Sequence, residues 1–216
     1  ALVFERPFTI YDNRLMEIVI SQEQVDAQPC DILVVGFFED ERPLQGSSGW
    51  VDWRLNGRLS RILMEQRLKG TWQEVTLMPA EGRLRAQLIL LIGLGKVKEY
   101  SYLRVREISP FLLSTLEKLR VAEVCISFPY GEPYNVDCGK LTEILIEAIA
   151  DGLEAKDAGQ PKEGPNHLRL YFSEGEERFP EVLLGARTAK SILQGRSKIR
   201  LLIPSEKNQP GGTSLP

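Results

Sequence analysis

Short apolar runs alternate along the chain with longer segments in which apolar residues recur every three or four positions. The two most apolar runs, 32–38 and 88–94, are too short for helices and rich in β-forming residues, so they predict strands that are covered on both faces. The remaining strands are expected at 15–20, 75–78, 124–128, 167–172 and 199–203.

The periodic segments predict amphipathic helices. They carry their apolar faces at Leu55 to Gln66, at Leu112 to Leu119, at Leu141 to Leu153 and at Val182 to Leu193. Ser109 and Pro110 resemble an N-cap followed by proline at the first helical position. The segment 102–108 before them can also be helical, with Pro110 then marking a kink or a break. The sequence leaves both alternatives open.

Alternation of strands and helices favours an α/β fold with three layers, in which helices cover both faces of a mainly parallel sheet. The early strands follow one another with less helix between them, which favours a mixed, mostly parallel sheet. We expect a single domain over residues 1–204. The Pro-, Gly- and Ser-rich segment 205–216 is expected to be a flexible tail.

Composition excludes several classes of function. The 216 residues carry a formal net charge of −3, which disfavours nucleic-acid and anionic-membrane partners. No apolar run approaches the ~20 residues of a membrane span, and the first residues lack the pattern of a signal peptide. Three cysteines without a CxxC pair make a disulfide framework improbable. These features predict a soluble, cytoplasmic protein.

Residues for catalysis are scarce. His167 is the single histidine of the chain, which excludes HExxH and all multi-histidine metal sites. Carboxylates gather at 39–41 and 174–177, but both groups lie in polar, turn-like stretches that are typical of solvated loops. We therefore expect no catalytic residues, no metal site and no cofactor.

Glycine-containing turns after predicted strands are the better candidates for a binding site, because backbone N–H groups can approach an anion there. Three places fit: Gly46, Ser47, Ser48 and Gly49 between a strand and a helix; Gly93 to Lys96; and Tyr130 with Gly131. None has the spacing of a dinucleotide-binding motif or a P-loop, and such a sequence is more often an ordinary turn than a phosphate-binding loop.

Several segments resemble the amino-terminal domain of the leucyl aminopeptidases. Residues 86–96 (AQLILLIGLGK) resemble its strand and GLGK turn, residues 30–36 (CDILVVG) its early strand, and residues 55–60 (LNGRLS) one of its helices. Residues 116–128 resemble the following helix and strand, and the resemblance covers roughly residues 13–203. It implies a macro-domain-like fold. In that family the metal ions and the catalytic lysine and arginine belong to a carboxy-terminal domain, whose motifs do not occur here.

The macro-like fold implies a ligand crevice near Asp31, Gly46 to Gly49, and Tyr130 with Gly131. The chain departs from the macro-domain pattern in two places. Residues 36–39 read GFFE where a macro domain has an asparagine-rich motif, and residues 130–133 read YGEP in place of a Ser-Thr-Gly series. These departures put ADP-ribose binding in doubt.

Three hypotheses follow. The first is a non-catalytic domain that acts in protein association, as a homo-oligomer or with a separate catalytic aminopeptidase subunit. The second is a module that binds a small nucleotide-like or ADP-ribose-like ligand in the crevice. The third is a part of a metal-dependent leucyl aminopeptidase whose catalytic domain is missing. The chain can be a stand-alone relative or a piece of a longer enzyme, and the sequence favours the former.

Overall fold

One seven-stranded sheet organises the fold, with strand order β3-β4-β2-β5-β6-β1-β7. The computed structural model describes residues 15–157, 167–195 and 199–204. The strands are β1 (Leu15–Ser21), β2 (Cys30–Phe37), β3 (Val75–Pro79), β4 (Ala86–Gly93), β5 (Glu123–Ser127), β6 (His167–Ser173) and β7 (Ile199–Leu202). Neighbouring strands are parallel throughout except for β3, which pairs antiparallel with β4. The mixed, mostly parallel sheet predicted from the sequence is confirmed.

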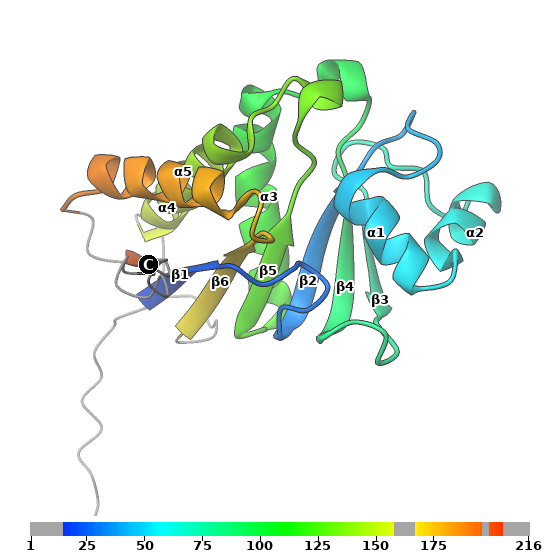
Figure 1. Ribbon diagram of the computed structural model, residues 1–216, viewed down its shortest axis with the longest axis horizontal. Coiled ribbons are helices and arrows are strands. Elements are labelled where there is room, and N and C mark those ends of the chain that lie inside the picture. Colours follow the sequence, from blue (N-terminus) through cyan, green and yellow to red (C-terminus); the bar gives the residue numbers. More distant parts are fainter. Residues whose placement is uncertain (1–14, 158–166, 196–198, 205–216) are drawn as a thin grey trace, which may run out of the picture.

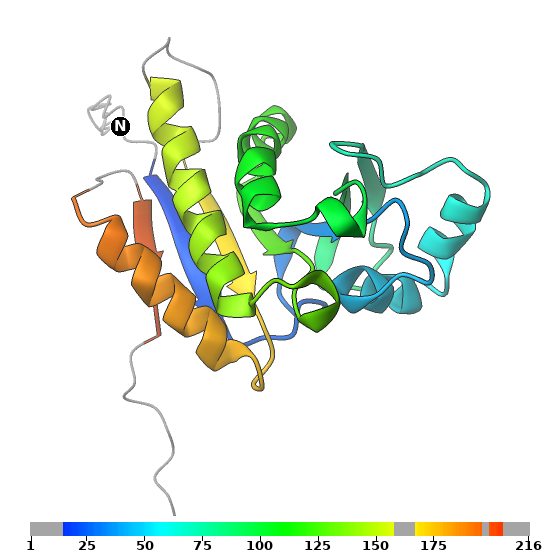
Figure 2. The same cartoon turned by 90° about the horizontal axis from the view of Figure 1, so that it is seen from above.

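Helices lie on both faces of this sheet (Figures 1 and 2). The helices are α1 (Gly46–Arg54), α2 (Arg58–Met64), α3 (Tyr102–Leu119), α4 (Cys138–Asp157) and α5 (Phe179–Ile192), with short 3-10 turns at Val97–Glu99 and Glu132–Tyr134. Helices α3, α4 and α5 share one hydrophobic core with the sheet, while α1 and α2 share another on the opposite face. The predicted three-layer α/β/α architecture is therefore confirmed.

Strand β2 contributes to both cores, as its continuous apolar sequence predicted. Ile32 and Val34 point into the core under α3 to α5, whereas Leu33 and Val35 point into the core under α1 and α2. Successive side chains of a strand face opposite sides, so a strand with helices on both sides must be apolar at every position.

The helix predicted across residues 55–66 is observed only over Arg58–Met64, as α2, and a separate helix, α1, precedes it. Helix α1 ends at Arg54, and Gly57 adopts a positive φ of 73° before α2 begins. Asp52 joins the two helices, because its Oδ1 accepts hydrogen bonds from the backbone N–H groups of Leu59 (2.8 Å) and Ser60 (3.1 Å). A carboxylate in this position satisfies the otherwise unpaired N–H groups at the start of α2.

Helix α3 resolves the ambiguity at Pro110. It runs without interruption from Tyr102 to Leu119 with Pro110 inside it, and Ser101 is the N-cap, accepting from the Arg104 N–H. Ser109 is not a cap: its hydroxyl donates to the Val105 carbonyl at 2.8 Å. Burial of the apolar face of α3 outweighs the hydrogen bond that the proline removes.

Some expectations fall outside the described residues. The predicted tail at 205–216 is among them, and a single domain over 1–204 remains a prediction.

The three cysteines, Cys30, Cys125 and Cys138, are free and buried. Among the described helices, none is long and apolar enough to cross a membrane.

Candidate functional site

A cleft of about 220 Å³ opens where several parallel strands end. The start of α1 supplies Gly46, Ser47 and Trp50, and the segment after β5 supplies residues 127–130. Glu174 comes directly after β6, and Gln24 with Val25 follow β1. We call this the strand-end cleft. Open α/β sheets bind ligands at such positions, because loops from neighbouring strands meet there.

Only two of the four residues of the predicted Gly46–Gly49 site line the cleft. Gly46 and Ser47 line the strand-end cleft, but these four residues form the first turn of α1 and not a free loop. Ser48 is only 1% exposed, and its hydroxyl donates to the Gln45 carbonyl at 2.8 Å. Gly49 packs so closely on the Leu44 carbonyl that a Cβ there would lie 2.5 Å from its oxygen. Ser48 and Gly49 therefore hold the helix in place and do not face the cleft.

Tyr130 and Gly131 also have different roles. Tyr130 lines the cleft, and its hydroxyl donates a 2.9 Å hydrogen bond to Oε2 of Glu174. Gly131 has a φ of 104°, a value that favours glycine, and its N–H donates to the Val136 carbonyl at 2.7 Å. That N–H is already used, so only Tyr130 of this pair presents a polar group to the cleft.

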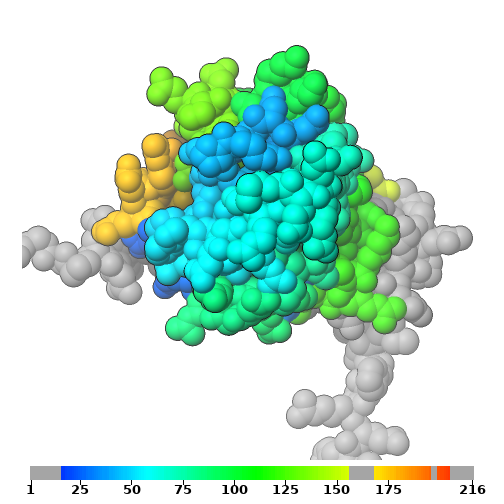
Figure 3. Space-filling view, turned by 90° about the vertical axis from the view of Figure 1, so that its right-hand side faces the viewer, coloured from blue at the N-terminus to red at the C-terminus, as the bar shows by residue number. Residues whose placement is uncertain are grey.

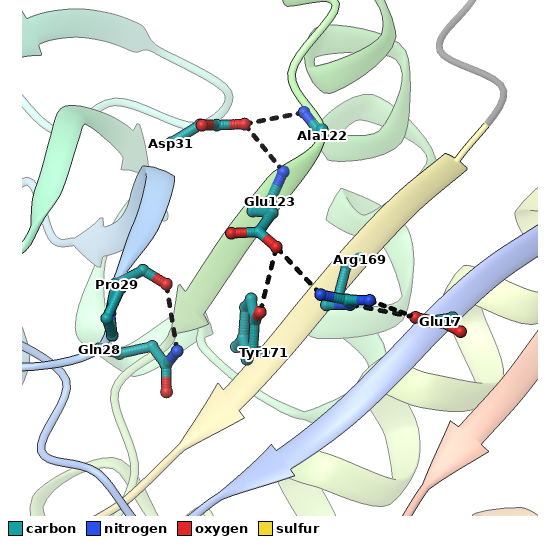
Figure 4. Close-up of polar contacts among 8 residues, drawn as sticks. All are labelled: Glu17, Gln28, Pro29, Asp31, Ala122, Glu123, Arg169 and Tyr171. Atoms are coloured by element: carbon teal, nitrogen blue, oxygen red, sulfur yellow. Dashed lines mark hydrogen bonds and ion pairs between the residues drawn. The ribbon is translucent and has the colours of Figure 1, made fainter.

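Asp31 does not belong to the same site. It lies at the amino end of β2, whereas Gly46 follows the carboxyl end, and the six residue-to-residue steps from Asp31 to Phe37 span roughly 20 Å. Its Oδ2 accepts hydrogen bonds from the N–H groups of Ala122 (3.0 Å) and Glu123 (2.9 Å), as Figure 4 shows. Asp31 thus ties the starts of β2 and β5 together.

An ion-pair network lies at the same amino ends (Figure 4). Arg169 on β6 donates through Nε (3.0 Å) and Nη2 (2.9 Å) to Oε2 of Glu17 on β1, and through Nη1 (3.0 Å) to Glu123 on β5. Glu17 and Glu123 stand directly beside Arg169 in the sheet register. This fork geometry satisfies a Glu17 side chain that is almost fully buried.

Glu174 was missed from the sequence, where residues 174–177 were interpreted as a solvated loop. Glu176 and Glu177 are exposed, as expected, but Glu174 is half-buried in the cleft wall. Burial raises the pKa of its carboxyl group, while the hydrogen bond from Tyr130 and the charge of Arg178 act in the opposite direction. The signal was its position immediately after a buried strand, where binding residues collect.

Ser47 contributes a second unusual polar group beside the cleft. Its Oγ is buried and has no hydrogen-bond partner among the described residues. Buried hydroxyl groups are normally paired, so an unpaired one next to a cleft is available to a ligand after a rotation about its side-chain bond.

The Gly93–Lys96 turn has a structural role. The Gly95 N–H donates to the Gly70 carbonyl (3.0 Å), and the Gly95 carbonyl accepts from the Glu39 N–H (2.8 Å). A Cβ on Gly93 would lie 2.0 Å from the Thr71 carbonyl oxygen. The two glycines allow three backbone segments to pack closely, and this turn does not line the strand-end cleft.

The described residues offer little further chemistry. Within residues 15–157, 167–195 and 199–204, no group of three or more His, Cys, Asp or Glu side chains is arranged to hold a metal ion. Burial raises the pKa of the Cys30 thiol to about 12, and it also raises the pKa values of Cys125 and Cys138. Because the thiolate is the reactive form, these thiols are poor nucleophiles at neutral pH.

The sequence is similar to part of several cytosol aminopeptidases. It is 26% identical over 187 residues to the cytosol aminopeptidase of Pseudomonas aeruginosa PAO1, covering 86% of this chain and 38% of that protein. It is 25% identical over 162 residues to a probable cytosol aminopeptidase of Sulfurihydrogenibium, covering 75% of this chain and 29% of that protein. The chain thus spans between a quarter and two fifths of the length of these relatives.

Solved structures agree on the fold. A mutant of tomato leucine aminopeptidase superposes with a TM-score of 0.57 at 17% identity, over 85% of this chain and 38% of that one. The Trypanosoma brucei macrodomain in complex with ADP-ribose gives a TM-score of 0.58 at 15% identity, over 79% of this chain and 68% of that one. The sheet and its helices are therefore macro-domain-like.

Residues 34–157, more than half of the chain, match the family described as the cytosol aminopeptidase family, N-terminal domain. The same residues run from the second half of β2 to the end of α4 and include the α1 and β5 walls of the strand-end cleft. The chain belongs to the cytosol aminopeptidase family through its N-terminal domain.

Proposed function

We propose that this chain is a non-catalytic domain that acts in protein association. The observation that carries the proposal is an exposed apolar surface on α1 and α2, which we call the tryptophan surface. It is formed by the stacked Trp50 (45% exposed) and Trp53 (63% exposed) of α1, and Met64 of α2 is also exposed (77%). Figure 3 views the molecule from the side on which residues of α1 and α2, in blue to cyan, form much of the visible surface.

The tryptophan surface is ordered by its own contacts. The rings of Trp50 and Trp53 stack with centroids 5.2 Å apart and an interplanar angle of 13°. The Arg54 guanidinium lies 5.1 Å from the Trp53 centroid and also pairs with Asp26. Large aromatic and arginine side chains contribute most of the binding energy at many interfaces, and side chains that are already held in place lose less entropy on binding.

The edge strand β3 supports the same proposal. It pairs only with β4, and its side chains Val75 and Leu77 are exposed. An exposed sheet edge with apolar side chains is a favourable place for pairing with another chain. The first partner to test is a second copy of this chain, which would form a homo-oligomer, and the second is a separate catalytic aminopeptidase subunit.

The decisive experiment measures the mass of the protein in solution by light scattering over a range of concentrations. We expect association that is weakened at least ~tenfold by Trp53→Ser, because the substitution removes more than ~1.4 kcal/mol of apolar contact. Leu103→Ser is the matched control, since Leu103 is 65% exposed but lies on α3. If the protein stays monomeric and Trp53→Ser also leaves its capture of a catalytic aminopeptidase subunit unchanged, the proposal is wrong.

Family membership supports a further candidate, in which the chain is one part of a metal-dependent leucyl aminopeptidase and the catalytic domain is separate. Release of product from leucine amide by the pure protein with Mn²⁺ or Zn²⁺ would contradict the non-catalytic proposal.

The relatives are named cytosol aminopeptidases, which supports a cytoplasmic location. The alternative function, binding of a nucleotide or ADP-ribose, rests on the macro-domain-like fold. Binding of such an anionic ligand depends on the charge of the strand-end cleft.

A further inference from the structure

The strand-end cleft has an unusual charge for its position. In α/β folds this place commonly receives phosphate groups, which are held by helix N-termini and basic side chains. Among the described residues that line the cleft, the only charged side chain is Glu174, which is an acid. A diphosphate would therefore meet like charge in a partly desolvated site, an arrangement that costs binding free energy.

The carboxylate of Glu174 can accept a further hydrogen bond. Tyr130 is its one side-chain hydrogen-bond donor among the described residues, and that bond reaches Oε2 at 2.9 Å. A carboxylate can accept about four hydrogen bonds, so the Tyr130 contact orients the group and leaves acceptor capacity. Arg178 lies close enough to influence Glu174, but its guanidinium forms an ion pair with Glu181 at 2.7 Å and does not line the cleft.

The other walls suit an apolar body. Val25, Phe128, Pro129 and the ring of Trp50 face the cleft beside the carboxylate. The cleft volume of about 220 Å³ is below the ~300–1,000 Å³ that is typical of pockets for larger ligands. The start of α1 at Gly46 and Ser47 adds the partial positive charge of a helix N-terminus, about half an elementary charge. This is smaller than the full negative charge of an ionised Glu174, so the cleft remains negative.

We infer that the strand-end cleft binds a small organic primary ammonium ion. Its nitrogen donates to Glu174, whose carboxylate Tyr130 holds in place, and its apolar part lies against Val25, Phe128 and Trp50. A free amine, an amino acid and the amino terminus of a peptide all share this chemistry. The cleft shares Trp50 with the tryptophan surface, but the two proposals are tested at different residues, Glu174 and Trp53, so either can fail while the other stands.

The test uses three probes with the same branched carbon skeleton and different charge: isopentylamine, isopentyl alcohol and isovalerate. Binding is followed by two-dimensional amide NMR, in which the signals of Gly46, Ser47 and Gly131 report on the cleft. We expect the amine to bind at least ~tenfold more tightly than the alcohol, because a hydrogen bond to a charged group contributes more than ~1.4 kcal/mol. Isovalerate and ADP-ribose should not bind there.

Two variants establish whether Glu174 is responsible. Glu174→Gln should weaken amine binding at least ~tenfold, because the amide has the same shape without the charge. Glu176→Gln is the matched control, since it removes an exposed carboxylate two residues away and should leave the affinity unchanged. Tyr130→Phe keeps the carboxylate but removes the donor that orients it, so it should weaken amine binding, and by less than Glu174→Gln does.

Several outcomes would overturn the inference. Equal affinity for the amine and the alcohol would show that charge plays no part. Equal weakening by Glu174→Gln and Glu176→Gln would show an unspecific effect of net charge, and tighter binding of ADP-ribose or isovalerate would show an anion site. Once the amine site is established, leucinamide and a Leu-Gly dipeptide distinguish a small amine from a peptide amino terminus.

Discussion

The carboxylates at the two ends of the parallel strands differ in their hydrogen-bond partners. At the amino ends, Asp31 accepts two backbone N–H groups, and Glu17 and Glu123 share the guanidinium of Arg169. At the carboxyl ends, Glu174 faces a cleft with Tyr130 as its described side-chain donor. A carboxylate with its partners in place contributes to folding, whereas one with remaining acceptor capacity beside a cleft is suited to a ligand.

The largest effect that we expect comes from breaking the network at the amino ends. Arg169→Met should lower the free energy of unfolding by about 2 kcal/mol, because it leaves the buried Glu17 without its fork partner. The loss is smaller than for a fully buried ion pair, because Arg169 is partly exposed to solvent. Urea unfolding measures this. Arg200→Met is the control: Arg200 is largely exposed and its Nη1 lies 3.8 Å from Glu17, so we expect a loss below about 0.5 kcal/mol.

Asp31 gives the next largest effect. Asp31→Ala should lower the free energy of unfolding by about 1 kcal/mol, because two N–H groups at the start of β5 lose their acceptor. Asp31→Asn keeps one acceptor oxygen and should cost less. Neither variant should change amine binding, since Asp31 lies at the far ends of the strands. A loss of amine affinity in Asp31→Asn, seen in the NMR titration, would return Asp31 to the binding site.

Glu174→Gln should have a smaller effect of opposite sign. Burial raises the folded-state pKa of Glu174 above its ordinary value of 4.5, so its stabilising contribution is present below that pH and is lost as the pH rises through the folded pKa. The amide does not ionise. The variant should therefore equal the parent at about pH 4 and be the more stable of the two at about pH 7.5.

Thermal unfolding at the two pH values measures this difference. Destabilisation by Glu174→Gln near neutral pH would mean that the ionised carboxylate stabilises the fold, as Glu17 does. The comparison between the two ends of the strands would then fail. The test is independent of any ligand, and it also shows whether the variant used in the amine titrations is folded.

The smallest effect is expected at Tyr130. Tyr130→Phe removes the hydrogen bond to Glu174 and should change the free energy of unfolding by less than about 0.5 kcal/mol, since water in the open cleft can replace the lost donor. Denaturant unfolding checks this value. A loss above about 2 kcal/mol would show that Glu174 depends on Tyr130 as Glu17 depends on Arg169.

The candidate site could be predicted from the sequence only in part. Gly46, Ser47 and Tyr130 follow buried strands and do line the cleft. Ser48 and Gly49 are predicted with them, but Ser48 is buried in α1 and Gly49 packs against the Leu44 carbonyl. Glu174 follows β6 directly, and Tyr130 is the third residue after β5. The acidic neighbours Glu176 and Glu177 make the segment of Glu174 resemble a solvated loop.

The sequence by itself determined the order and type of the elements except for α1, because apolar runs and helical periodicity record which faces must be buried. It also carried the family relationship, through short segments in a fixed order. The tertiary structure alone decided which ends of the strands hold Asp31 and which hold Glu174, and which carboxylates find partners. Hydrogen bonds such as that between Arg169 and Glu17 join residues 152 positions apart, so they depend on sheet register and not on local pattern.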